Sequence, residues 1–442
     1  MILTLFKFVV ALPALNLIYL FFFSYEVRNV TFVTNLLSLF FIFVIVLLLN
    51  YSTLNPQFEL ELYYSSFYNI SYILFMDGLS SLFVLLTNFL FVLCFLLLWV
   101  NSYKLKEILI TLNFTQFFLL NVFCISDLII FYICFEAILM PMFLLIGIWG
   151  SRDRKVLAAY QFFLYTLFGS LFMLLAIIFV FFHIGFLDFF LLNEISFSFP
   201  RQFLLWSLFF FAFSIKVPMF PVHIWLPEAH VEAPTAGSVL LAGILLKLGT
   251  YAMLRFLIPL FPIASFYFTP FVFLLGSLGV IYASLATLAQ VDLKKIVAYS
   301  SVAHMSFVVL GLFSFSFQGI LGSIFLMLSH GFVSAGLFFL VGFLYERYKS
   351  RLLLYYGGLQ SLMPVFCFYL LSFSLANLSL PGTSSFIGEV LIFIGLIFSN
   401  SVIVVLSSST MVFSAGYSLW FYNRVANGVI KSLFIKLYCD VT

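Results

Sequence analysis

The feature that most constrains this chain is a succession of long apolar runs separated by short polar or Pro/Gly-containing breaks. About 20 apolar residues are enough to cross the hydrocarbon core of a bilayer as a helix. The breaks define about thirteen runs of roughly that length, and we predict a membrane span for each. The predicted spans are residues 2–23, 30–50, 73–99, 108–124, 128–150, 157–186, 203–226, 235–261, 267–290, 296–317, 319–345, 362–399 and 402–422.

Composition indicates that lipid, not water, surrounds most of the chain. Hydrophobic residues make up 65% of the sequence and charged residues only 8%, whereas a soluble domain carries roughly 25% charged residues. A net charge of +3 is too small to indicate a nucleic-acid partner. The first 23 residues show no Arg-rich presequence pattern, so we expect a first span there. The fold class is therefore predicted as an all-α polytopic membrane protein.

Loop charges predict the orientation of the spans. Most of the nineteen Lys and Arg residues follow odd-numbered spans and so lie on one side, whereas the opposite loops carry essentially Arg201. An excess of Lys and Arg marks the inner side of a membrane, so we predict an outer N-terminus and an inner C-terminus. The residues assigned to the inner side are Arg28, Lys104, Lys106, Arg152, Arg154, Lys155, Lys294, Lys295, Arg347, Lys349, Arg351, Arg424, Lys431 and Lys436.

The seventh and twelfth predicted spans are broken by proline. Pro218 and Pro221 interrupt the seventh, and Leu-Pro-Gly at 380–382 interrupts the twelfth. Proline removes a helical hydrogen bond, and broken helices at matching places in opposed halves are typical of inverted-repeat transporters. We predict N-terminal helices at 1–107, a first five-helix repeat at 108–261, an inverted second repeat at 267–422 and a short inner tail at 423–442.

Several titratable residues fall near the middle of predicted spans, where charge is costly. They are Glu136, Lys216, Lys247, His304, His330 and Glu389. A central Lys or acidic residue costs about 2.5–3.5 kcal/mol on insertion scales. Taken singly, each has a simpler explanation, since a Lys can extend to the interface and a buried His is often only hydrogen-bonded. Because the whole set lies at similar depth, the pattern favours a proton relay.

The residue types suit proton transfer. A desolvated Lys gives up its proton more readily, and a nearby carboxylate reverses that effect. We therefore predict that Glu136 and Lys216 form a switch that holds a proton or releases it toward Lys247. Histidine titrates near neutral pH and both donates and accepts protons, so the two histidines would pass protons on to Glu389 as the exit group.

The cysteines offer no sign of redox chemistry within the chain. They show no CxxC pair and no metal-ligand spacing, and most lie in apolar runs where a Cys is usually a small packing residue. We expect no metal, iron–sulfur cluster or disulfide framework. The cysteines are Cys94, Cys124, Cys134, Cys367 and Cys439.

Several motifs resemble the antiporter-like subunits of respiratory complex I. Residues 213–238 read FSIKVPMFPVHIWLPEAHVEAPTAGS, followed by LAGILLKLG at 241–249. DGLS at 77–80, FEA at 135–137 and SSVAHM at 300–305 belong to the same pattern. The segment NLSLPGTSSFIGE at 377–389 places Glu389 in the broken helix, which is typical of one type of these subunits, since the related types carry Lys there. The resemblance covers residues from about 77 to 427.

This resemblance implies a function and a setting. It implies proton translocation through Glu136, Lys216, Lys247 and Glu389, coupled to NADH oxidation and quinone reduction in other subunits. NADH, FMN, iron–sulfur clusters and ubiquinone would be handled by those subunits, with no cofactor in this chain. The expected partners are other membrane-arm subunits, including two related antiporter-like chains, and membrane lipids. The expected location is the mitochondrial inner membrane, with the N-terminus in the intermembrane space and the C-terminus in the matrix.

Two departures and three alternatives accompany this interpretation. A fourteenth span, usual in the family, is not expected after residue 427, and Glu228 stands where mitochondrial relatives commonly have Lys. A cation/proton antiporter subunit of the Mrp type shares the same motifs. A haem carrier with His304 and His330 as axial ligands is a second alternative, although no second pair of ligands exists. A purely structural subunit is the third, and the mid-membrane lysines argue against it.

Overall fold

A computed structural model describes residues 2–23, 26–49, 58–65, 70–99, 103–431 and 440 of the chain. Lys436, Cys439 and much of the predicted 423–442 tail lie outside the described residues. The chain forms two compact units, Met1–Phe213 with Arg255–Ala264, and Ser214–Leu254 with Ser265–Thr442. The predicted division into repeats stays a prediction.

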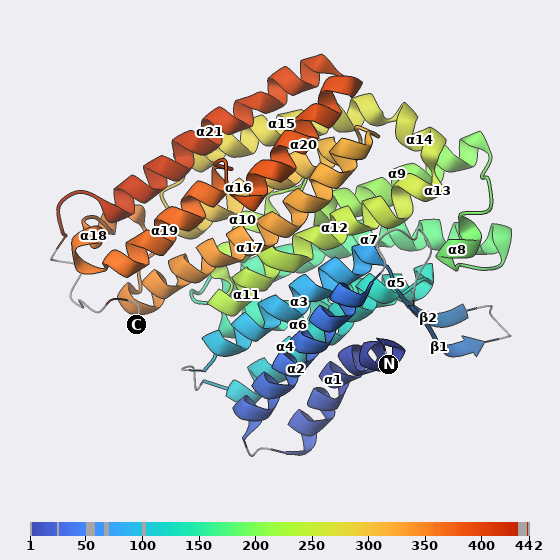
Figure 1. Ribbon diagram of the computed structural model, residues 1–442, viewed down its shortest axis with the longest axis horizontal. Coiled ribbons are helices and arrows are strands. Elements are labelled where there is room, and N and C mark those ends of the chain that lie inside the picture. The colour runs from blue at the N-terminus through green and yellow to red at the C-terminus, as the bar shows by residue number, and fades with distance from the viewer. Residues whose placement is uncertain are drawn as a thin grey trace. The chain divides into compact units, whose positions relative to one another are not determined.

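The first unit is built from the N-terminal helices. Helices α1 and α2, at the blue end of the ribbon in Figure 1, pack against each other, and α3 and α4 pack on them. Its elements are α1 (Ile2–Phe22), α2 (Val27–Leu48), β1 (Phe58–Ser65), β2 (Ile70–Met76), α3 (Gly78–Leu97), α4 (Leu105–Cys124), α5 (Leu128–Ala137), α6 (Leu139–Trp149), α7 (Lys155–Ile184), α8 (Phe189–Leu192), most of α9 (Phe199–Lys216), α13 (Ile258–Leu260) and the start of α14 (Pro262–Tyr267).

The second unit is built around α17, which packs against α16, α19 and α20. Helix α15 lies between α16 and α21, as Figure 1 shows in yellow to red. Its elements are α10 (Trp225–Glu232), α11 (Thr235–Leu240), the π-helical η1 (Leu241–Leu245), α12 (Leu246–Ala252), the start of the π-helical η2 (Met253–Leu257), α15 (Thr269–Ala289), α16 (Leu293–Leu312), α17 (Phe317–Tyr348), the 3₁₀ turn η3 (Leu353–Tyr355), α18 (Leu359–Leu362), α19 (Pro364–Asn377), α20 (Ser384–Ser399) and α21 (Ser401–Ala426).

The polytopic all-α fold class is confirmed, while the count of thirteen spans is not. In the described part of the chain, eleven helices are long and apolar enough to cross a membrane. The two predicted broken spans appear instead as shorter pieces. The seventh is divided into α9 and α10, and the twelfth into α19 and α20. Length and apolarity alone therefore do not settle how many crossings the chain makes.

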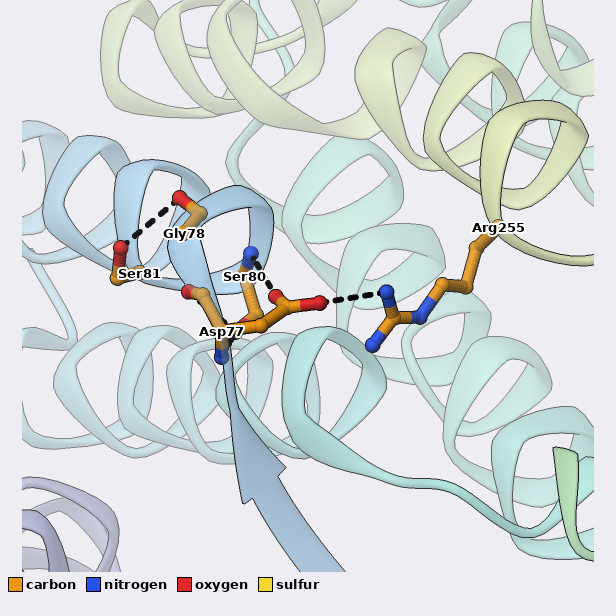
Figure 2. Close-up of polar contacts among 5 residues, drawn as sticks. All are labelled: Asp77, Gly78, Ser80, Ser81 and Arg255. Carbon is orange, nitrogen blue, oxygen red and sulfur yellow. Dashed lines mark hydrogen bonds and ion pairs between the residues drawn. The ribbon is translucent and has the colours of Figure 1, made fainter. Parts of the chain in front are cut away.

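The start of the third predicted span is wrong. Residues 73–76 belong to β2, which pairs antiparallel with β1 from Phe58 opposite Met76 to Ser65 opposite Ile70. Aromatic and β-branched residues dominate this run and favour a strand. The helix begins only after Asp77, whose side chain accepts the Ser80 backbone N–H while the Ser80 hydroxyl accepts the Asp77 N–H (Figure 2). This capping box fixes the first residue of α3.

Asp77 also anchors the far end of the eighth span. Its second carboxylate oxygen lies 2.6 Å from a guanidinium nitrogen of Arg255, as Figure 2 shows. The guanidinium is also 4.3 Å from the centre of the Phe75 ring and 5.1 Å from that of Phe189. A planar cation between a carboxylate and two aromatic faces is held by both charge and stacking. This arrangement explains how Arg255 is tolerated near the end of an apolar helix.

The break in the twelfth span has a clear local cause. Ser379 and Gly382 have positive φ values of 62° and 99°, on either side of Pro381. Proline cannot donate the next helical hydrogen bond, and the positive φ values turn the chain out of the helix. The Ser385 hydroxyl then donates to the Ala376 carbonyl at 2.5 Å, across the break. A backbone group freed by the interruption is thereby satisfied inside the protein.

Uncharged polar side chains join the helices of the first unit. The Asn88 side-chain oxygen of α3 accepts from Gln116 of α4 at 3.0 Å and from Ser38 of α2 at 3.4 Å. Asn16 of α1 donates to Asn113 of α4 at 3.5 Å. All of these side chains are buried. We call this set, Asn16, Ser38, Asn88, Asn113 and Gln116, the amide cluster. Such bonds hold helices together where apolar burial gives little net attraction.

Candidate functional site

The centre of the second unit holds a buried Lys–His contact. Lys247 of α12 is fully buried, and its ammonium nitrogen lies 2.8 Å from Nδ1 of His330 on α17. The same nitrogen donates to the Ala242 carbonyl, which belongs to the π-helical turn η1. π-Helical turns inside α-helices often occur at functional sites. With a carbonyl acceptor on one side and an imidazole on the other, Lys247 is placed to exchange a proton with His330.

His304 continues the contact toward the broken twelfth span. The ring centres of His330 and His304 are 5.6 Å apart, and Nδ1 of His304 lies 3.4 Å from a carboxylate oxygen of Glu389. His330, His304 and Glu389 are all buried. We call the set Lys247, His330, His304 and Glu389 the buried titratable chain. It connects α12, α17, α16 and α20, four elements from widely separated parts of the sequence.

A small polar cavity adjoins the Glu389 end of this chain. Its volume is about 10 Å³, close to the room that one water molecule needs. The lining residues are Ser284, Ala303, His304, Phe307, Glu389, Thr410, Ser414 and Tyr417. Nε2 of His304 is buried and has no hydrogen-bond partner among the described residues. Space for a water beside an imidazole and a carboxylate provides a hydrogen-bonded route where direct contacts are long.

Lys216 and Glu136 lie in different units of the chain. Lys216 ends α9 directly before the break, is 7% exposed and belongs to the second unit. Glu136 lies in the last turn of α5 and belongs to the first unit. The Trp225 indole donates to the Ile215 carbonyl at 3.1 Å, which satisfies one backbone group beside the break. The predicted switch between Glu136 and Lys216 stays a prediction.

A second buried histidine region was missed by the sequence argument. His230 of α10 is fully buried, stacks on Phe338 with ring centres 4.6 Å apart, and has no hydrogen-bond partner for either ring nitrogen among the described residues. Its place in the LPEAHVEAP motif was the available signal, since His230 lies just beyond the predicted seventh span, which ends at residue 226.

Three basic residues that the sequence assigned to one membrane face form ion pairs or hydrogen bonds with α10 and the residue that follows it. Lys295 lies 2.7 Å from Glu228, and Arg351 lies 3.6 Å from Glu232. Lys294 donates to the Ala233 carbonyl at 2.8 Å, and Arg351 also donates to the Val231 carbonyl. Lys294 and Arg351 are buried, not solvated loop charges. These contacts fix the segment after the broken seventh span.

The described residues contain no His, Cys, Asp or Glu group suited to hold a metal ion.

Comparison with known proteins identifies the family of the chain. The profile of the NADH:quinone oxidoreductase/Mrp antiporter transmembrane family matches residues 125–414. The "NADH-ubiquinone oxidoreductase chain 4" of Marchantia polymorpha is 55% identical over 417 residues, covering 94% of this chain and 84% of that protein. The protein of the same name from Arabidopsis thaliana is 55% identical over 392 residues, covering 88% of this chain and 79% of that protein.

Solved structures give the same result for the fold. A chain of respiratory complex I from Thermus thermophilus with bound NADH superposes with a TM-score of 0.87 at 28% identity, covering 97% of this chain and 90% of that chain. A chain of an archaeal membrane-bound sulfane sulfur reductase also has a TM-score of 0.87, at 19% identity, and covers 95% of this chain and 88% of that chain. At that identity the likeness concerns the fold alone.

Proposed function

Because this chain belongs to the NADH:quinone oxidoreductase/Mrp antiporter membrane-subunit family, and within it to the chain 4 subunits of NADH-ubiquinone oxidoreductase, we propose that it translocates protons along the buried titratable chain. It would do so as a membrane-arm subunit of the complex, beside the related antiporter-like chains. NADH oxidation and quinone reduction would take place in other subunits, with NADH, FMN, iron–sulfur clusters and ubiquinone bound there.

One observation carries the proposal. The 2.8 Å contact between Lys247 and His330 joins a base and an imidazole in a fully buried setting. A Lys there is costly when charged and unpaired, so its proton must be shared or passed on. His330 accepts a proton at Nδ1 when that nitrogen is unprotonated, and loss of the proton on Nε2 then returns the ring to its neutral form as the tautomer protonated at Nδ1. A histidine at this position therefore supports onward transfer, which a side-chain amide would not.

The other end of the chain supplies the proton acceptor. His304 lies between His330 and Glu389, with the small polar cavity beside it. A proton that reaches His304 is within reach of the Glu389 carboxylate either directly, after a small side-chain movement, or through one water. Glu389 follows the break between α19 and α20, where backbone bonding is interrupted. Interrupted helices in membranes usually line wet or protein-filled sites, which supports Glu389 as the exit group.

The predicted switch extends the same proposal upstream. Lys216 ends α9 at the other helix break, and Glu136 is an acidic residue within the fifth predicted span. A carboxylate near Lys216 would hold its proton, and separation of the two would release it toward Lys247. We further propose that the protein lies in the mitochondrial inner membrane. The N-terminus would face the intermembrane space and the C-terminus the matrix, as the loop charges indicate.

The test compares relay variants with matched surface variants in the assembled complex. Lys247→Met and Glu389→Gln remove one proton-exchanging group each, while Lys349→Met and Glu194→Gln make the same changes at residues outside the buried titratable chain. In sealed vesicles, NADH-driven proton uptake per NADH oxidised should fall in the first pair by the share that this chain carries, because the related antiporter-like chains would still translocate protons. The second pair should match wild type.

Two results would redirect the proposal. Full proton translocation by both relay variants, in a complex of normal composition, would mean that protons move elsewhere. Wild-type transport that requires sodium, and stops when sodium is removed, would favour the antiporter activity that the Mrp part of the family name implies. Native electrophoresis with an NADH-oxidation stain checks that the chain is present in the active complex in each case.

A further inference from the structure

A second small cavity adjoins the Glu389 end of the buried titratable chain. Its volume is about 10 Å³, the same as that of the cavity beside Glu389. We call the two the inner cavity and the Glu389 cavity. Among the described residues that line them, only Tyr417 of α21 lines both. We propose that the Tyr417 hydroxyl passes protons from the inner cavity to Glu389 as a second inlet, an inference that rests on the proposed proton translocation.

The inner cavity lies closer to the start of α16 than the Glu389 cavity does. Its lining on α16 runs from Ile296 to Ser300, whereas that of the Glu389 cavity runs from Ala303 to Phe307. The offset from 296 to 303 is seven residues, which corresponds to about 10 Å along the helix. Because α16 begins at Leu293, the inner cavity reaches within about one turn of a helix end that the loop charges predict to face inward.

The wall of the inner cavity is polar and uncharged, which suits water. Ser300, Ser374 and Ser418 line it, and each hydroxyl donates to a carbonyl of its own helix. The three hydroxyl oxygens can therefore still accept hydrogen bonds. The described lining contains no Asp, Glu, His, Lys or Arg. The cavity thus gives one water molecule both the room and the polar partners that it needs.

Tyr417 is placed to connect the inner cavity with Glu389. Its side chain is buried, and its hydroxyl shares a hydrogen bond with the side chain of Asn377, the last residue of α19. Glu389 lies beyond the helix break, on α20, and lines the Glu389 cavity together with Tyr417. Tyr417 therefore borders both pieces of the broken twelfth span, where backbone bonding is interrupted and water is tolerated.

A tyrosine hydroxyl can pass a proton without becoming charged. It gives its own proton to a water beside Glu389, which protonates the carboxylate, while its oxygen takes a proton from a water in the inner cavity. Each oxygen between the two ends breaks one O–H bond and forms another, and rotation of the new O–H bond restores the starting arrangement. A proton that enters at the inner side and leaves through Glu389 moves in the pumping direction, so this inlet does not short-circuit the relay.

The experiment compares tyrosine variants in the assembled complex. Proton uptake per NADH oxidised is measured in sealed vesicles with a pH-sensitive dye, one pH unit below and one pH unit above neutrality. Tyr417→Phe keeps the ring and removes only the hydroxyl. Relative to wild type, uptake should fall by at most the share that this chain carries. The loss should be larger at the higher pH, because fewer protons are then available to the slowed inlet.

Tyr356→Phe is the matched control. It removes the hydroxyl of another buried tyrosine, which donates to the Ser350 carbonyl at 2.7 Å and lines neither cavity. It should match wild type at both pH values. Wild-type uptake by Tyr417→Phe at both values, in a complex of normal composition, overturns the inference. A loss of equal size at both pH values, or in both tyrosine variants, would assign Tyr417 a structural role and overturns it as well.

Glu389→Gln separates this inference from the proposed function. Full uptake by Glu389→Gln would refute the proposed route through that carboxylate, and the inlet with it. A loss in Glu389→Gln together with normal uptake in Tyr417→Phe would refute the inlet alone. The double variant should lose no more uptake than Glu389→Gln does, because the inlet leads only to Glu389. A further loss in the double variant would mean that Tyr417 acts elsewhere.

Discussion

Two buried polar regions of this protein differ in chemistry although both lie among apolar helices. The amide cluster of the first unit contains only Asn, Gln and Ser, whereas the buried titratable chain of the second unit contains Lys, His and Glu. Side-chain amides do not titrate near neutral pH, so a cluster made mainly of them can link helices but has no group that takes up a proton and becomes charged. Lysine, histidine and glutamate change charge with their surroundings. Burial alone therefore does not identify the transport path, and titratability does.

The largest expected difference in proton uptake per NADH oxidised is between variants of His330 and of Asn88. His330→Leu should reduce proton uptake per NADH oxidised by the share that this chain carries, because it removes the group that receives the proton from Lys247. Asn88→Leu should leave that ratio unchanged, because no proton passes the amide cluster. Both are measured in sealed vesicles with a pH-sensitive dye. A loss of coupling in Asn88→Leu comparable with that of His330→Leu would erase the distinction between the two regions.

A second comparison uses the charged contact of the first unit. Arg255→Gln should lower the stability of the complex by about 2 kcal/mol, since it leaves the Asp77 carboxylate with one partner fewer. It should not alter proton uptake per NADH, because the Asp77–Arg255 pair is structural. Thermal loss of NADH-oxidation activity gives the stability. Arg255→Lys should recover part of it, because the charge is kept and the stacking on Phe75 is lost.

The amide cluster itself makes a smaller contribution. Asn88→Leu should cost about 1 kcal/mol, in the range measured for polar contacts between membrane helices. Gln116 would then lack its partner. The double variant Asn88→Leu with Gln116→Leu should cost less than the sum of the two single variants, since replacing both partners leaves no unpaired amide. Additive losses in thermal stability would mean that the two side chains act independently.

The sequence predicted the residues of the second-unit site well, but it predicted the segments between the spans poorly. Lys247, His330, His304 and Glu389 were all singled out by depth, and the structure brings them together. His230 was missed because it lies just beyond the predicted seventh span, where the expected free-energy cost of a polar residue is small. The β1–β2 hairpin was missed because apolarity alone extended the third span to residue 73, although the run of aromatic and β-branched residues favoured a strand.

By itself the sequence determined that the chain is a polytopic membrane protein and which helices are broken. These follow from local rules, because a helix rises about 1.5 Å per residue and proline interrupts it wherever it stands. Only the tertiary structure decided which charges meet. The contacts of Lys247 with His330 and of His304 with Glu389 depend on how α12, α16, α17 and α20 are rotated against one another. That rotation is set by packing between helices distant in the sequence, which no local pattern encodes.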